Sequence, residues 1–98
     1  MNKKVDNELL DELFEAFLLL ENKEECKSFF LDLCTINELK AMSQRWQVAK
    51  MLKDKVVYQK IADETGASTA TISRVSRSLN YGSEGYNIIL DKLENKDV

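Results

Sequence analysis

The sequence lacks proline and histidine and has little glycine or cysteine, and each shortage excludes a class of structure or chemistry. With no proline and three glycines in 98 residues, and with apolar residues at helical rather than alternating spacing, the chain is predicted to be all-α. The absence of histidine removes the usual general base, and no Ser/His or Cys/His pair is available for nucleophilic catalysis. We therefore expect a binding protein rather than an enzyme.

The two cysteines and the apolar segments exclude further classes. Cys26 and Cys34 are isolated, without CxxC spacing or the histidine that would complete a zinc site. We expect reduced thiols on helices, with no metal and no cofactor. No apolar run approaches the length of a membrane span, and the N-terminus has no apolar segment beside a cleavage site. A cytoplasmic protein without membrane contact is expected.

Charge is divided unevenly along the chain, although the net charge is only −3. Residues 40–81 hold eight basic and three acidic side chains, which gives +5. Residues 1–39 hold four basic and ten acidic ones, which gives −6, and residues 82–98 sum to −2. A positive segment of this kind is typical of a phosphate-binding surface, whereas any single lysine in it can equally belong to an ordinary solvated surface.

The positive segment contains the spacing of a helix-turn-helix over residues 57–79. Two short helices are predicted to meet at Gly66, where the chain must reverse and a positive φ favours glycine. Ser68 is placed to cap the second helix through its hydroxyl. The small Ala62 permits close helix crossing. The apolar stripe of the second helix is Ile72, Val75 and Leu79.

The opposite face of the second helix carries small hydroxyl residues, two arginines and no acidic residue. Such a face can enter the major groove, where arginine binds guanine edges or phosphates. The residues expected to contact DNA are Gln59, Lys60, Ser68, Thr69, Ala70, Thr71, Ser73, Arg74 and Arg77. The alternative is an αα-hairpin with a soluble Ser/Thr-rich face.

Three helices are predicted before this unit and one after it, in a single domain spanning 1–98. The first covers about 7–20, Asn22 and Glu25 form a plausible capping box for the second, and Thr35 and Glu38 form one for the third, which runs to about Lys53. The last helix is placed at 83–93, with Ser83 as its cap and a disordered, charged segment after Glu94. The predicted inward residues are Cys26, Phe29, Phe30 and Leu33 in the second helix, Leu39, Met42, Trp46, Ala49 and Leu52 in the third, and Tyr86, Ile89, Leu90 and Leu93 in the last.

The first two helices are too rich in leucine and phenylalanine to be covered within so short a chain. Residues 7–53 are therefore predicted to form a dimerisation region. A two-fold homodimer would place two recognition helices in successive major-groove faces about 34 Å apart, on a palindromic operator. The alternative is a monomer whose leucines lie in an ordinary core.

The sequence resembles the Trp repressor superfamily, and more specifically the YerC/YecD branch of Trp-repressor-like proteins of Gram-positive bacteria. The likeness is carried by Ala-Thr-Ile-Ser-Arg in the recognition helix, by Gly66-Ala67 before it, by the Thr35–Leu52 helix, and by the stretch from Thr65 to Tyr86. It implies an intertwined homodimer of six-helix chains, with the helix-turn-helix pairs as two reading heads.

The resemblance also implies a small-molecule effector, such as an amino acid, bound by Thr35, Arg45 and Arg74. Two guanidiniums can enclose an aromatic ring and pair with a carboxylate. The chain departs from the family pattern in having Val75 in place of glycine and in a shorter interval from Arg45 to Arg74. It also has its own Trp46. The alternative is that no effector binds, in which case Arg45 has the role of a phosphate contact or surface pair and Arg74 that of direct DNA contact.

The leading hypothesis is therefore a dimeric, sequence-specific DNA-binding transcriptional regulator, a repressor on a palindromic operator. The rival from another class is a helical protein-interaction adaptor that does not bind DNA. An adaptor needs neither the segregated charge nor the acid-free helix face.

Overall fold

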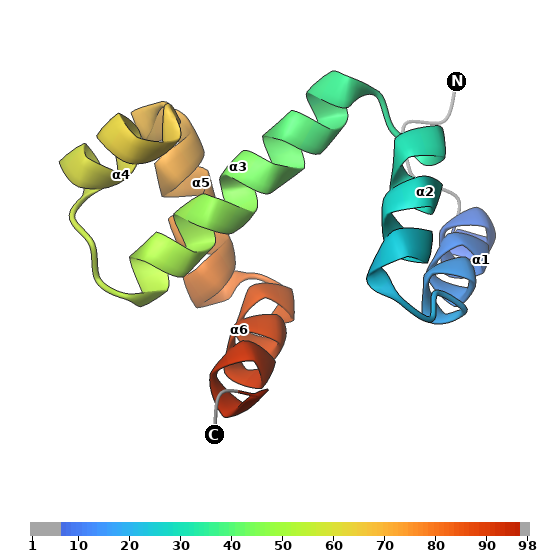
Figure 1. The fold of residues 1–98 in the computed structure, drawn as a ribbon. Helices are drawn as coiled ribbons and strands as arrows, with labels where there is room; N and C mark the ends of the chain where they lie inside the picture. The colour runs from blue at the N-terminus through green and yellow to red at the C-terminus, as the bar shows by residue number, and fades with distance from the viewer. Residues whose placement is uncertain (1–6, 97–98) are drawn as a thin grey trace. The chain divides into compact units, whose positions relative to one another are not determined.

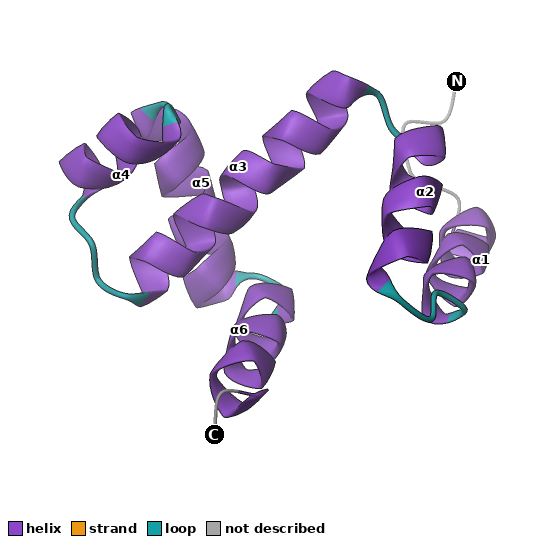
Figure 2. Cartoon of the chain, viewed as in Figure 1, coloured by secondary structure: helices purple, strands orange, loops and turns teal. Residues whose placement is uncertain are grey.

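Six α-helices make up residues 7–96, the part of the chain that this computed structural model describes (Figure 1). Only turns and short loops join them (Figure 2). The predicted all-α class and the existence of six helices are confirmed, whereas the frayed start expected at residues 1–6 lies outside the described residues. The helices are α1 (Asn7–Leu18), α2 (Lys23–Leu33), α3 (Ile36–Lys53), α4 (Tyr58–Thr65), α5 (Thr69–Tyr81) and α6 (Gly85–Lys96).

The chain divides after Leu39 into two compact units, which we call the first and the second unit. The first contains α1, α2 and the start of α3, and the second contains the rest of α3 with α4, α5 and α6. The assignment of 1–98 to one domain, with 7–53 as the dimerisation region, stays a prediction.

Side-chain caps begin the helices of the first unit as the sequence predicts. Asn22 Oδ1 accepts a hydrogen bond from the Glu25 amide at 2.8 Å, and Glu25 Oε1 accepts one from the Glu21 amide at 3.0 Å. Thr35 and Glu38 form a full reciprocal box before α3, at 2.8 Å and 3.0 Å. Both boxes therefore satisfy amide groups that a helix start leaves without a partner.

The end of α1 differs from the prediction, because the helix stops at Leu18 rather than near Leu20. The next two amides bond three residues back, from Leu19 to Ala16 at 3.0 Å and from Leu20 to Phe17 at 3.1 Å. This tighter spacing closes the last turn and directs the chain into α2.

Aromatic contacts hold α1 against α2, yet neither helix contains a buried residue. Phe17 stacks on Phe30 with ring centroids 5.2 Å apart and meets the edge of Phe29 at 5.7 Å. Leu18 is 84% exposed and Leu19 77%. The apolar surface that the sequence predicts to need a cover is therefore open within this chain. In α2, Cys26, Phe29 and Phe30 are half-buried as expected, whereas Leu33 is exposed.

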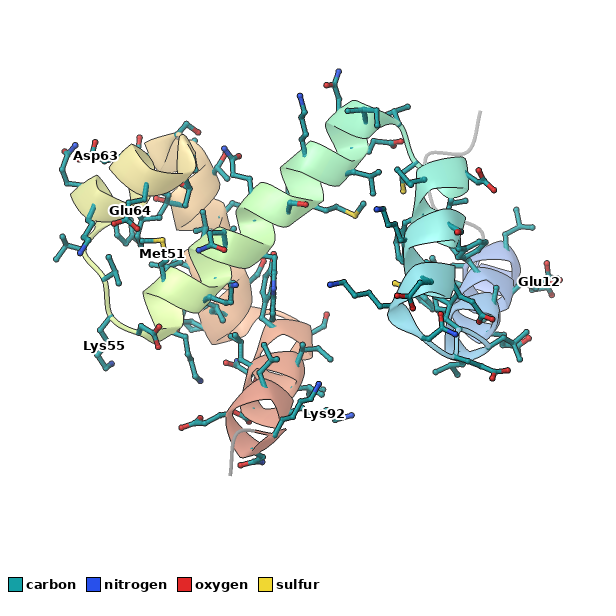
Figure 3. All side chains as sticks on the ribbon, viewed as in Figure 1. Glu12, Met51, Lys55, Asp63, Glu64 and Lys92 are labelled. Atoms are coloured by element: carbon teal, nitrogen blue, oxygen red, sulfur yellow. The ribbon has the colours of Figure 1, made fainter. Side chains whose placement is uncertain are left out.

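The core of the second unit forms where α4 and α5 pack on the C-terminal half of α3. Met51 lies at this junction (Figure 3). The predicted inward side of α3 included Ala49 but missed Val48 and Met51, because α3 has apolar residues on more than one side and the prediction followed one stripe. The buried cluster is Val48, Ala49, Met51, Ile61, Ala67, Ile72 and Val75.

The chain leaves α3 through a Schellman turn, after the helix end at Lys53 that the sequence predicts. The Val56 amide bonds to the Met51 carbonyl and the Lys55 amide to the Leu52 carbonyl, both at 3.0 Å. Lys55 has φ 63°, a left-handed conformation in which glycine is usual. Its side chain is exposed in the loop after α3 (Figure 3).

The junction of α5 and α6 corrects two predictions, the cap and the end of the last helix. Gly82 ends α5 with a φ of −90°, outside the left-handed region. A Cβ on Gly82 would collide with the Ser78 carbonyl, so the need for glycine is steric. Glu84, with φ 69°, and not Ser83, precedes α6, and the helix continues through Lys96 beyond the predicted end.

The apolar face of α6 is covered only in part. Leu90 is buried, and Tyr86 stacks on Trp46 of α3 with ring centroids 6.3 Å apart. Ile89 and Leu93, which were predicted to face inward, are 48% and 43% exposed.

Candidate nucleic-acid interface

A left-handed glycine and a set of hydrogen bonds fix the turn between α4 and α5. Gly66 has φ 74°, as predicted, and its amide bonds to the Ala62 carbonyl at 2.9 Å. The Thr65 hydroxyl donates to the Ile61 carbonyl at 2.7 Å and accepts from the Ala67 amide at 3.1 Å. This threonine was not singled out in the sequence, although a hydroxyl residue just before a turn glycine is a readable signal.

The start of α5 is capped by Ser68, which confirms the predicted cap. Its Oγ accepts from the Thr71 amide and donates to Thr71 Oγ1, both at 3.1 Å. Ile72 and Val75 are buried and Leu79 is half-buried, as the apolar stripe requires. The opposite face of α5 is thereby directed outward.

The outward face of α5 contains most of the residues predicted to contact DNA. Thr71 differs from them because it is half-buried and its hydroxyl takes part in the cap. Within residues 7–96, neither Arg74 nor Arg77 forms an ion pair. The exposed predicted residues of this region are Ser68, Thr69, Ala70, Ser73, Arg74 and Arg77.

The helix before this face, α4, carries two acidic residues, and each has a partner four residues earlier. Gln59 Nε2 donates to Asp63 Oδ1 at 3.1 Å. Lys60 Nζ lies 4.0 Å from Glu64 Oε1, with both side chains more than half exposed. Asp63 and Glu64 both project from α4 (Figure 3). The predicted contact residues Gln59 and Lys60 are exposed and reduce the local effect of these carboxylates.

The three residues assigned to an effector are distributed over both units. Thr35 belongs to the first unit, and its hydroxyl accepts from the Glu38 amide. Arg45 is half-buried on α3 and Arg74 is exposed on α5, both in the second unit. Neither arginine forms a hydrogen bond with another described residue. Val75 is 1% exposed and belongs to the core.

Trp46 is engaged by its neighbours rather than open to a ligand. Its ring stacks on Tyr86, and Lys50 Nζ lies 5.9 Å from the ring centroid. The sequence predicted that Trp46 faces inward but did not identify Tyr86 as its partner.

The described residues form neither a metal site nor a membrane span. No group of three or more His, Cys, Asp or Glu side chains in that part of the chain is arranged to hold a metal ion. None of the six helices in residues 7–96 is long and apolar enough to cross a membrane. Cys26 and Cys34 are free thiols and half-buried.

Comparison with known proteins gives matches over nearly the whole chain. The family described as Trp repressor protein matches residues 8–94. An uncharacterised protein of Bacillus subtilis (strain 168), YerC, is 51% identical over 95 residues, which are 97% of this chain and 91% of that protein.

Two solved structures share the fold. A TrpR-like protein from Eubacterium eligens superposes with a TM-score of 0.88 at 50% identity, covering 95% of this chain and 96% of that one. A crystal structure of a candidate Trp repressor from Staphylococcus aureus gives 0.84 at 59% identity, with 88% and 86% covered. The predicted resemblance is confirmed, and this chain belongs to the Trp repressor family.

Proposed function

We propose that this chain is a dimeric, sequence-specific DNA-binding regulator of transcription, a repressor that occludes a promoter. The observation that carries the proposal is the exposed face of α5, which combines small side chains with two arginines and no acidic residue. Membership of the Trp repressor family supports the same function.

The chemistry of that face suits a major groove. Small residues such as Thr69, Ala70 and Ser73 allow the helix backbone to approach base edges closely. Arg74 and Arg77 then reach guanine edges or phosphates with bidentate donors. Because neither arginine is held by a carboxylate within residues 7–96, these two side chains can reach DNA without breaking an ion pair of their own.

In this proposal, α4, the first helix of the helix-turn-helix, lies at the DNA backbone. Gln59 and Lys60 lie in the first turn of α4, where helix amides favour a phosphate. Val57 precedes this helix without a side-chain cap, so these amides are not occupied by a side chain of their own.

The first unit supports a homodimer. It has an aromatic cluster but no buried residue in α1 or α2, and its leucines remain open to solvent. A second copy of the chain would cover this apolar surface and provide the second recognition helix. Two helices related by a two-fold axis bind a palindromic operator with half-sites about 34 Å apart.

An effector with a carboxylate, such as an amino acid, is the finer part of this proposal. Arg45 and Arg74 are available for a carboxylate, whereas the Thr35 hydroxyl already serves as a helix cap. Val75 fills core volume beside Arg74 in the sequence, which disfavours a ligand as large as an indole. A thermal-shift screen of amino acids on wild type and Arg45→Ala tests this part, and no shift in either protein contradicts it.

One experiment tests the main proposal. Bound duplexes are selected from a random pool, with and without a mixture of amino acids, and sequenced. A two-fold symmetric consensus is expected, and a change in enrichment with the mixture would support the effector. Recovery of random sequence alone contradicts sequence-specific binding.

The rival adaptor function makes a simpler prediction. Pure protein would then fail to retard random duplex even at low salt, where phosphate contacts are strongest. Retardation at low salt that weakens as salt rises contradicts the adaptor.

A further inference from the structure

Polar contacts join α3 to the helix-turn-helix at two places, directly at the end of α4, just before α5, and through α6 at the end of α5. Near its start, Gln44 Nε2 of α3 donates to the Thr65 carbonyl at 3.1 Å, which we call the turn contact. At its end, Asn87 Nδ2 of α6 donates to the Leu79 carbonyl at 3.0 Å, while Asn87 Oδ1 accepts from Lys53 Nζ of α3 at 3.0 Å. We call this chain of bonds the end contact.

Both contacts use carbonyl groups that helix geometry leaves without a partner. The last four carbonyls of an α-helix have no acceptor role inside it. Thr65 is the last residue of α4, and Leu79 lies in the last turn of α5. Each contact therefore fixes the end of one helix of the helix-turn-helix to a side chain from outside that pair.

The core between the two contacts is entirely apolar. No polar or charged residue is buried among the described residues, and the buried cluster consists of aliphatic side chains. Apolar burial stabilises the packing but is not directional, whereas a hydrogen bond weakens when its angle or length changes. The core alone therefore resists small sliding or rotation of α5 only weakly.

The two contacts are well placed to resist such movement. Gln44 and Lys53 are nine residues apart on α3, about 13 Å along a helix at 1.5 Å per residue. Two attachments at this separation constrain both the tilt of α5 and its rotation about its own axis. One attachment would leave α5 able to pivot about it.

We propose that Gln44 and Asn87 are positioning residues that set the orientation of α5 on α3. They would thereby govern how the exposed face of α5 discriminates between DNA sequences. The inference rests on the proposed DNA-binding function. Base-edge contacts require close placement of side chains, whereas flexible lysines and arginines still reach phosphates after a small displacement. Loss of either contact therefore reduces specific binding more than non-specific binding.

Gln44→Met tests the turn contact, because methionine retains the approximate shape of glutamine and removes the donor. The matched control is Gln47→Met, the same change at an exposed position of the same helix. Affinity is measured by fluorescence anisotropy for the selected operator and for random duplex. One neutral hydrogen bond corresponds to a loss of about 3- to 10-fold in the ratio of the two affinities. The control is expected to retain the wild-type ratio.

Gln44→Glu distinguishes positioning from general loss of packing. A carboxylate cannot donate to the Thr65 carbonyl and repels it, so the ratio at neutral pH is expected to fall further than in Gln44→Met. A protonated carboxyl can donate. Relative to wild type at each pH, the ratio is therefore expected to recover as pH falls towards the ordinary glutamate pKa of about 4.3. An effect independent of pH contradicts the role of the donor.

Asn87→Leu tests the end contact against Asn95→Leu, a matched change at an exposed position of α6. The affinity ratio is expected to fall by about 3- to 10-fold in the first variant only. An unchanged ratio, or an equal loss of affinity for both duplexes, overturns the role of Asn87.

The orientation of α5 is also measured without DNA. Residual dipolar couplings of backbone amides in α3 and α5 give the angle between the two helices in each variant. We expect this angle to change in Gln44→Met and Asn87→Leu and to stay constant in both controls. If wild type does not discriminate between duplexes, the proposed function fails, and unchanged couplings then independently overturn the positioning role.

Discussion

The two units of this chain solve the problem of burying apolar side chains in opposite ways. The second unit packs seven buried residues around the junction of α3, α4 and α5. In the first, α1 and α2 meet through phenylalanine rings but bury no residue, and Leu18 and Leu19 remain largely exposed. The second unit therefore has a buried core of its own, whereas the first leaves much of its apolar surface exposed.

Ile72→Ala tests the core of the second unit and is expected to have the largest effect on stability. The Ile72 side chain is fully buried, so the cavity should lower the free energy of unfolding by about 2–5 kcal/mol. Urea denaturation measures it. Ser73→Ala, on the exposed face of the same helix, should change stability by no more than about 0.5 kcal/mol. Equal effects at both positions would contradict the assigned core.

Leu18→Ser tests the open surface of the first unit. Leu18 is 84% exposed in the single chain, so its loss should matter only if a second copy covers it. Burial of one leucine is worth about 1.5–3 kcal/mol, so the dimer dissociation constant should rise by about tenfold or more. Sedimentation velocity over a concentration series measures the dissociation constant, with Ser83→Ala at an exposed loop as control. An unchanged constant removes Leu18 from the interface.

Arg77→Ala tests the exposed face of α5 in the second unit. If the guanidinium contacts a base edge, about 1–3 kcal/mol of binding energy and selectivity at one position should be lost. If it contacts phosphate, binding should weaken for all sequences and the salt slope should fall by about one. A gel-shift series across salt separates the two outcomes, and unchanged affinity and selectivity would exclude Arg77 from the interface.

Gly66→Ala tests the turn between α4 and α5. The position has φ 74°, and a Cβ there would meet only Gln44 Nε2, at an ordinary 3.9 Å. The penalty is therefore conformational, about 1–2 kcal/mol. Thermal unfolding should show the loss. Gly85→Ala is the comparison, because a Cβ at Gly85 meets no atom within 4 Å and its φ is not positive.

The smallest effect is expected from Lys55→Gly at the end of α3. Lys55 has φ 63°, so glycine should relieve left-handed strain and stabilise the second unit by up to about 1 kcal/mol, less the entropy that glycine adds to the unfolded chain. Urea denaturation compared with Gln47→Gly, at an exposed position inside α3, should show opposite signs. A loss of stability in both variants would show that the strain at Lys55 is negligible.

Local chemistry made much of the fold predictable from sequence. The caps at Asn22, Thr35 and Ser68 and the glycine turn at Gly66 depend on contacts within a few residues, and all four were found as predicted. The resemblance to the Trp repressor family was likewise visible in the sequence, because residues close together in the chain carry it. The predicted DNA-contact and effector residues stay predictions, because their roles depend on molecules outside the chain.

Features that depend on distant partners were missed. The buried positions of Val48 and Met51 follow from where α4 and α5 dock on α3, which periodicity in α3 alone does not reveal. The left-handed Lys55 and Glu84 have side chains that do not signal such geometry. Gln44 was overlooked because its partner, the Thr65 carbonyl, lies 21 residues away and is a backbone group common to all sequences.

In the proposed function, the Lys60–Glu64 pair would give α4 a built-in competitor for nucleic acid. To reach a phosphate, Lys60 would have to leave a carboxylate that stays beside it, although an exposed pair is worth only about 0–1 kcal/mol. Such a carboxylate would act equally against every duplex sequence. It would therefore shorten the time spent on random DNA, while operator sites would compensate through base contacts.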